Sequence, residues 1–189
     1  MNVVCFAGYS GSGKTNLIER LIPAFRLRGL RVSVAKHAHH KFDIDHPGKD
    51  TFRNREAGAF EVVVASHRRL ALMREFEQEA HLSVHHLLAE LYDGVDWVFV
   101  EGFKSSDLLK IEVWRHAAGK PTRYVDDQFI AAIATDSPEE LPEATLRPVL
   151  DLNDTDAVAD WLLDNADRFE YDAARYLPGL YRDMADDSL

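Results

Sequence analysis

The residues with the clearest chemical meaning form one segment near the N-terminus, Gly8-Tyr9-Ser10-Gly11-Ser12-Gly13-Lys14-Thr15. This segment matches the phosphate-binding pattern G-x-x-x-x-G-K-[ST] at every fixed position. Glycines let the backbone curl, so that several N–H groups converge on phosphate oxygens. Lys14 can reach the β- and γ-phosphates, and the Thr15 hydroxyl can complete a Mg²⁺ shell. We therefore predict that a nucleotide is bound by Gly8, Ser10, Gly11, Ser12, Gly13, Lys14, Thr15 and Asn16.

A loop of this kind needs a strand before it and a helix after it. Val3–Ala7 is a short apolar run, which is typical of a strand buried on both faces. Residues 16–28 carry apolar side chains at helical spacing, and Gly29 is a C-terminal stop signal. The predicted helix directs its positive N-terminal end at the bound phosphates.

An acidic residue that could hold the metal follows a second buried strand. Trp97–Val100 is apolar throughout, and Glu101 comes directly after it. Ligands of open α/β sheets bind at the carboxyl ends of the strands. We therefore predict Lys14 and Glu101 as the catalytic residues, and Glu101 and Thr15 as magnesium ligands. Asp96 precedes the same strand and is interpreted as a surface residue.

A polar segment from residue 37 to residue 55 is dense in groups that bind metals or protons. It includes the histidines His37, His39 and His40, and the acids Asp45 and Asp50. It could be a solvated loop, or a transition-metal site, because imidazoles at this spacing can converge. It could also face the phosphates, where Asp45 or Asp50 would assist Mg²⁺. The scattered histidines are interpreted as ordinary surface residues: His67, His81, His85, His86 and His116.

The order of the predicted elements indicates an α/β fold with a mainly parallel sheet flanked by helices, as in P-loop NTPases. Further strands are predicted at residues 31–36, 61–65, 70–74, 111–114, 130–134 and 149–152, and further helices at 85–92 and 154–165. The pieces at 61–74 and 111–115 are the candidates for antiparallel strands, the former as a hairpin. We predict a nucleotide-binding domain at 1–166 and an acidic C-terminal tail at 167–189.

Composition and charge limit the function classes. The 189 residues are 46% hydrophobic and 29% charged, which is ordinary for one soluble globular domain. With 22 Lys+Arg against 32 Asp+Glu, the net charge of −10 argues against a bulk nucleic-acid binder. We also expect no membrane span, because no run of eighteen apolar residues occurs. The start of the chain is expected to be a strand rather than a signal peptide, and the expected location is the cytoplasm.

Several further segments, in the same order along residues 2–165, resemble the family of molybdopterin-guanine dinucleotide biosynthesis adapter proteins. After the phosphate loop they include Lys36-His37-Ala38-His39-His40, Asp43-Ile44-Asp45, Pro47-Gly48-Lys49-Asp50, Glu101-Gly102-Phe103-Lys104 and Ala134-Thr135-Asp136. The phosphate loop alone is generic. The histidine-rich segment followed by Gly-Lys-Asp and then Glu-Gly-Phe-Lys is much more specific.

The resemblance implies a protein that binds GTP with Mg²⁺, hydrolyses it slowly and forms a homodimer. Its implied partners are the guanylyltransferase that joins GMP to molybdopterin and other molybdenum cofactor enzymes, which it assists without performing the transfer. Glu101 would be the second acid of the site, and Asp45 and Asp50 match the family's loop. We further hypothesise that Asp136 accepts hydrogen bonds from guanine N1–H and the N2 amine.

Two other functions stay open at this point. A small-molecule kinase fits the size and the phosphate loop, although it would need an acceptor pocket and a mobile lid with arginines. A nucleotide-gated metal-delivery protein would use His37, His39 and His40 as its metal handle.

Overall fold

The computed structural model describes residues 1–38, 42–91 and 93–176 of the chain. These residues form two compact units: a main unit from the described part of residues 1–37 and 83–189, and a small unit from the described part of residues 38–82. The chain therefore divides around an internal segment, and the predicted boundary between residues 166 and 167 stays a prediction. The reason for this division is that the small unit has a two-stranded sheet of its own, separate from the larger sheet.

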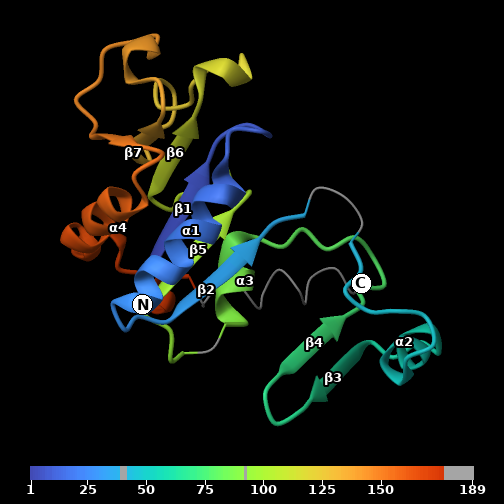
Figure 1. Cartoon of the computed structure of the whole chain (residues 1–189). Coiled ribbons are helices and arrows are strands. Elements are labelled where there is room, and N and C mark those ends of the chain that lie inside the picture. Colours follow the sequence, from blue (N-terminus) through green and yellow to red (C-terminus); the bar gives the residue numbers. More distant parts are fainter. Residues whose placement is uncertain (39–41, 92, 177–189) are drawn as a thin grey trace. The chain divides into compact units, whose positions relative to one another are not determined.

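The main unit is built on a six-stranded sheet with the strand order β2-β5-β1-β6-β7-β8 (Figure 1). The strands are β1 (Asn2–Ala7), β2 (Val32–Lys36), β5 (Trp97–Glu101), β6 (Lys110–Trp114), β7 (Ile130–Thr135) and β8 (Val149–Asp151). Every pairing is parallel, which confirms the predicted fold class. The antiparallel direction considered for 111–115 is wrong, because β6 runs parallel to both β1 and β7. The short link from β5 to β6 has no helix, so it lacks the sequence signal of a parallel crossover.

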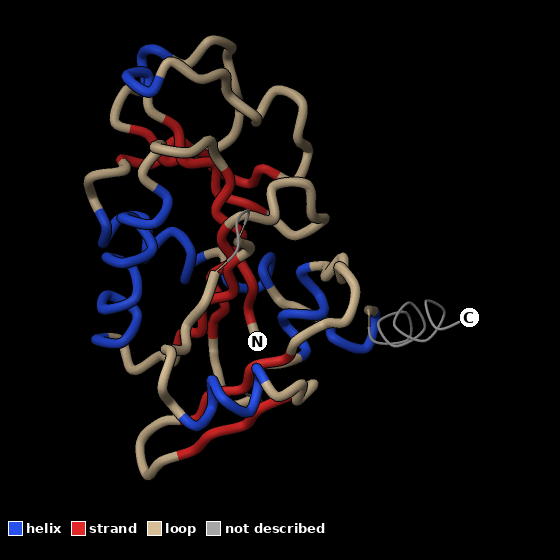
Figure 2. Tube along the Cα trace, turned by 90° about the vertical axis from the view of Figure 1, so that its right-hand side faces the viewer, coloured by secondary structure: helices blue, strands red, loops and turns tan. Residues whose placement is uncertain are grey.

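Helices cover both faces of this sheet (Figure 2). They are α1 (Lys14–Leu27), α3 (Val84–Ala89) and α4 (Thr155–Asp164), with 3₁₀ turns at His116–Ala118, Pro138–Glu140, Ala166–Phe169 and Ala173–Arg175. Side chains alternate along β1, so Val4 and Phe6 pack in the cluster with α1 and α4, whereas Val3 and Cys5 pack in the cluster with α3. The Cys5 thiol is fully buried, and this burial raises its pKa to about 12. The side chains on both faces of the central strand β1 are therefore buried.

The small unit contains α2 (Asp50–Glu56) and an antiparallel hairpin of β3 (Glu61–Ala65) and β4 (Leu70–Arg74). The prediction of a hairpin from these two segments is confirmed. Helix α2 covers the end of the polar segment of residues 37–55, for which the sequence predicted no helix. It has seven residues and buries none of them, so it shows no apolar periodicity in the sequence.

The first part of the expected tail packs against the main unit. Phe169 is buried, Glu170 forms a backbone bridge with Asn2, and the Tyr171 ring stacks on His85. The Asp107 carboxylate accepts a hydrogen bond from the His85 Nε2 atom at 3.1 Å. The interpretation of His85 as an ordinary surface residue is therefore wrong, because aromatic stacking from a distant segment was invisible in the sequence. Residues 177–189 lie outside the described part of the chain.

Two charged side chains are buried in the middle of the sheet, on β6. The Glu112 carboxylate accepts hydrogen bonds from the backbone N–H groups of Arg123 (2.6 Å) and Tyr124 (2.8 Å), and burial raises its pKa. The Lys110 ammonium donates to the Ser106 carbonyl (2.5 Å) and lies 3.3 Å from the Asp127 carboxylate. Both charges therefore hold the connection that follows β6 in one conformation.

Replacing Glu112 by glutamine should destabilise the protein. One carboxylate oxygen becomes an NH₂ group, which leaves a buried backbone N–H without its acceptor and costs about 1–3 kcal/mol. Urea unfolding followed by tryptophan fluorescence measures this loss. Glu139→Gln changes an exposed residue in the same way and is the control. Equal midpoints for the two variants would contradict the structural role of Glu112.

Candidate nucleotide-binding site

The candidate site lies at the carboxyl ends of the central strands. The connection that follows β1 leads to β2, which lies on one side of β1 in the strand order, while β6 lies on the other side. Strand β1 therefore stands at a topological switch point, where α/β sheets bind their ligands. The register places Phe6 of β1 opposite Glu101 of β5, and Trp114 of β6 opposite Thr135 of β7. The residues that follow these pairs are thereby brought to one edge.

The phosphate loop (Gly8–Thr15) joins β1 to α1 and has the backbone of an anion cradle. Gly13, the N-cap of α1, has a φ of 99°, a left-handed conformation that glycine adopts without strain. The Ser12 hydroxyl oxygen is buried without a hydrogen-bond partner among the described residues. A buried hydroxyl without a partner is costly, so this atom fits a loop that closes around a ligand oxygen.

Lys14 points back into the loop. Its ammonium donates hydrogen bonds to the carbonyl oxygens of Gly8 (3.0 Å) and Tyr9 (2.8 Å). Burial lowers the pKa of Lys14, and the nearby Glu101 carboxylate opposes this shift. A lysine ammonium held between neutral carbonyls gains from an anion, because a phosphate adds the attraction of an opposite charge where water is partly excluded.

Thr15 and Glu101 meet, as the strand-end argument predicted. The Thr15 hydroxyl donates to one Glu101 oxygen at 2.7 Å, and the Lys36 ammonium lies 3.2 Å from the other. Glu101 is only 9% exposed. A hydroxyl and a carboxylate side by side suit Mg²⁺, which prefers oxygen ligands. The residues present therefore fit a magnesium ion beside the phosphates.

Asp136 is paired with Arg115, a residue that the sequence analysis did not identify. Arg115 follows β6, and its guanidinium forms an ion pair with the Asp136 carboxylate, which also accepts a hydrogen bond from the Ser137 hydroxyl at 3.0 Å. The Arg115 Nε atom would lie 3.3 Å from a Cβ built on Gly13. Arg115 therefore connects the phosphate loop with the end of β7. Its position directly after a buried strand, like that of Glu101, was the available signal.

Asp45 and Asp50 belong to the small unit. Low exposure would raise the pKa of Asp45, but hydrogen bonds from Thr51 (2.9 Å), the His46 backbone (3.0 Å) and Arg55 (3.3 Å) lower it. Asp50 lies exposed in the first turn of α2. The Asp45 carboxylate thus accepts its hydrogen bonds from residues of its own unit. A magnesium role for Asp45 or Asp50 stays a prediction.

The histidine-rich segment is described in part. The His37 ring lies 5.0 Å from the Phe103 ring, between centroids, whereas His39 and His40 lie outside the described residues. Within residues 1–38, 42–91 and 93–176, no group of three histidine, cysteine or acidic side chains is arranged to hold a metal. In the same part of the chain, no helix has the length and apolar character needed to cross a membrane.

The family model described as MobB, "Molybdopterin guanine dinucleotide synthesis protein B", matches residues 3–136. The chain belongs to the MobB family. Two curated relatives carry the name molybdopterin-guanine dinucleotide biosynthesis adapter protein. The one from Escherichia coli is 40% identical over 164 residues, which are 86% of this chain and 91% of the relative. The one from Haemophilus influenzae is 41% identical over 157 residues, which are 82% and 84%.

Solved MobB structures have the same fold. The MobB homologue from Bacillus stearothermophilus is 27% identical, with a TM-score of 0.63, and the match covers 88% of this chain and 99% of that one. A second structure, of molybdopterin-guanine biosynthesis protein B, is 26% identical, with a TM-score of 0.65 and coverages of 86% and 99%. The six-stranded parallel sheet is thus a MobB fold.

Proposed function

We propose that this MobB protein binds GTP with Mg²⁺ and hydrolyses it slowly while it assists molybdopterin guanine dinucleotide synthesis. The observation that carries the proposal is the meeting of Lys14, Thr15 and Glu101 at the phosphate loop. Lys14 would bind the phosphates, while Thr15 and Glu101 would hold the magnesium ion, which neutralises phosphate charge when bound. Asp136 would accept hydrogen bonds from the guanine edge.

Slow hydrolysis is supported by the surroundings of Glu101. One carboxylate oxygen accepts the Thr15 hydrogen bond and the other is paired with Lys36. A carboxylate with both oxygens engaged in this way is poorly placed to orient an attacking water. The site is therefore better suited to binding a nucleotide than to turning it over.

The pathway assignment is supported by the family description and by the names of the two curated relatives. We propose that the protein acts as an adapter beside the guanylyltransferase and other molybdenum cofactor enzymes. A homodimer and a cytoplasmic location complete this proposal, and both stay predictions.

Calorimetric titration with GTP and then with ATP, each with Mg²⁺, tests the nucleotide site. Wild-type protein should bind GTP more tightly than ATP. Lys14→Ala should weaken GTP binding by about 100-fold or more, because it removes charged hydrogen bonds to phosphate worth about 3 kcal/mol. Lys120→Ala removes an exposed lysine outside the loop and should bind as wild type does.

Equal or tighter ATP binding would contradict the guanine assignment and would favour the kinase alternative. Unchanged GTP affinity in Lys14→Ala would contradict the phosphate loop as the binding site. Stimulated guanine dinucleotide formation in a mixture with the guanylyltransferase would test the adapter role separately.

A further inference from the structure

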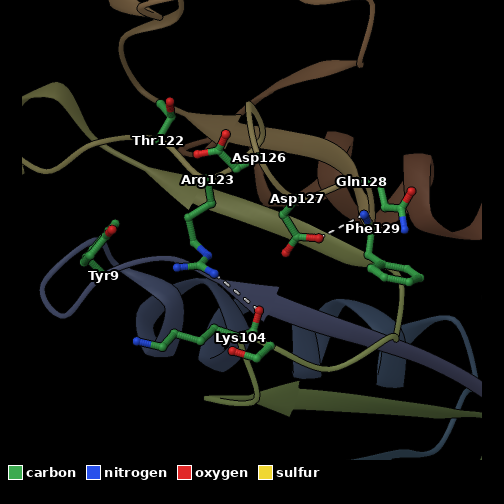
Figure 3. Close-up of a pocket in the computed structure, with 9 residues that line it drawn as sticks. Tyr9, Lys104, Thr122, Arg123, Asp126, Asp127, Gln128 and Phe129 are labelled. Atoms are coloured by element: carbon green, nitrogen blue, oxygen red, sulfur yellow. Dashed lines mark hydrogen bonds between the residues drawn. The ribbon is translucent and has the colours of Figure 1, made fainter.

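A second concave site lies beside the phosphate loop, in the main unit. It is a cavity of about 480 Å³, which is within the range of small-molecule pockets. Tyr9 of the phosphate loop forms one wall, and Lys104 and Ser105 of the β5–β6 connection form another. Residues 122, 123 and 126–129 of the β6–β7 connection form the rest (Figure 3). The nucleotide site described above uses none of these side chains.

The end of this cavity nearest Tyr9 carries two positive charges. In Figure 3, the Arg123 guanidinium and the Lys104 ammonium both lie on this side. One Arg123 nitrogen donates a long hydrogen bond of 3.5 Å to the Lys104 carbonyl oxygen, and its Nε is buried without a partner among the described residues. A guanidinium offers five N–H donors in a fixed fork, which matches two oxygens of a phosphate or carboxylate. This end is therefore built to receive an anion.

The connection that carries Arg123 is held rigid by the buried charges of β6. Glu112 binds the backbone N–H groups of Arg123 and Tyr124, and Lys110 is paired with Asp127. Burying charges in a central strand is unfavourable, and a protein with hydrophobic residues of similar size at these positions would often be as stable. What these charges provide is a fixed position for Arg123, and a fixed position lowers the entropy cost of binding a ligand.

The other end of the cavity suits a planar ring. Phe129 and Gln128 lie there, away from the two cations (Figure 3). Asp126 also lines the cavity, on the side of Thr122 and Arg123 (Figure 3). It is exposed, and in the described part of the chain its carboxylate accepts no hydrogen bond from another residue. A carboxylate is a natural acceptor for the adjacent N–H donors of a heterocycle.

We propose that this pocket binds a second ligand, an aromatic heterocycle that carries a phosphate or carboxylate group, next to the nucleotide's phosphates. Arg123 and Lys104 bind the anionic group, and Asp126 accepts hydrogen bonds from the ring. Pterins and guanine both contain a 2-amino-4-oxopyrimidine ring with the same adjacent N–H donors, so both are sources of this chemistry. The proposal rests on the proposed function only in placing a nucleotide in the neighbouring loop.

Binding of three probes tests the pocket: pterin-6-carboxylate, GMP and inorganic phosphate. Each is titrated into Lys14→Ala protein, whose phosphate loop no longer competes, and into wild-type protein saturated with Mg²⁺ and a non-hydrolysable GTP analogue. At least one heterocyclic probe should bind in both samples, and more tightly than inorganic phosphate. The heterocycle with the higher affinity identifies the source of the ligand. Because the first sample needs no nucleotide, failure of the proposed function leaves the test intact.

Two variants locate the binding. Arg123→Gln and Lys104→Gln, each made in the Lys14→Ala background, should weaken probe binding by about 10- to 100-fold, as expected for the loss of charged hydrogen bonds. Arg123 also attracts the buried Glu112 carboxylate, so its variant can lose stability for that reason. Lys104 is exposed and has no such structural role, which keeps the test valid. Arg26→Gln and Lys120→Gln alter exposed residues elsewhere and should leave probe binding unchanged.

Three results would overturn the proposal. One is that neither heterocycle binds in either sample. Another is that probe affinity is unchanged in both Arg123→Gln and Lys104→Gln, which would place the probe elsewhere. The third is competition, in which the GTP analogue displaces the probe from wild-type protein, because the probe would then occupy the phosphate loop itself.

Discussion

Replacing Gly8 by alanine should cost about 3–5 kcal/mol of stability, a large part of what holds a domain of this size together. Gly8 has a φ of +142°, a conformation that residues with a Cβ rarely adopt. In addition, a Cβ at this position would lie 2.4 Å from the carbonyl oxygen of Val113, on the neighbouring strand β6. Because that oxygen belongs to the sheet backbone, it cannot move aside easily. The phosphate loop or the edge of β6 must then distort, and nucleotide binding should be lost as well.

Gly29→Ala is the matched control for this effect. Gly29 also has a positive φ, of 79°, but a Cβ there would meet no atom within 4 Å. Its replacement should therefore cost only the backbone strain, about 1–2 kcal/mol. Urea unfolding of both variants, followed by the fluorescence of the buried Trp97, measures the difference. Equal losses in the two variants would show that the contact with Val113 does not matter.

The pair of Arg115 and Asp136 should control the preference for guanine over adenine. Asp136→Asn removes the carboxylate and should reduce the ratio of GTP to ATP affinity by about 10- to 100-fold. Arg115→Gln should reduce the same ratio less, because the Ser137 hydroxyl still holds the Asp136 carboxylate. The double variant should match Asp136→Asn alone, since Arg115 acts on this ratio as a positioning residue through Asp136.

Arg115→Lys separates positioning from a general effect of charge. Lysine keeps the positive charge but lacks the planar fork, so the GTP to ATP ratio should recover only in part. Titration of all four variants with both nucleotides supplies the measurements. An unchanged ratio in Asp136→Asn would remove Asp136 as the base-reading residue. Independent, multiplying effects of the two substitutions would remove the positioning role of Arg115.

The sequence was sufficient for the parts of the site that depend on local patterns. The phosphate loop is contiguous in sequence, and the apolar run before Glu101 showed which strand end presents the second acid. Both could be predicted because the carboxyl ends of parallel strands gather at one edge, whatever the details of packing. The meeting of Thr15 and Glu101, 86 residues apart, followed from that rule.

Other features depend on contacts that no local pattern encodes. Lys110 and Glu112 interrupt an apolar strand, and only the fold shows that they fix the connection carrying Arg123. The parallel direction of β6 was missed because its connection from β5 has no helix. Helix α2 was missed because it buries no residue and so leaves no periodic signal.

Cys5 is the single cysteine of the chain, and it is buried at the centre of β1, two residues before the final strand residue and three before Gly8. A thiol reagent needs both access and a thiolate, and burial denies it both. Cys5 can therefore react only when β1 separates from its neighbours, the same strand that leads into the phosphate loop. The chain thus carries an intrinsic reporter of local opening at its ligand-binding edge, and a ligand that tightens the loop protects this thiol by the same free energy with which it stabilises the closed strand.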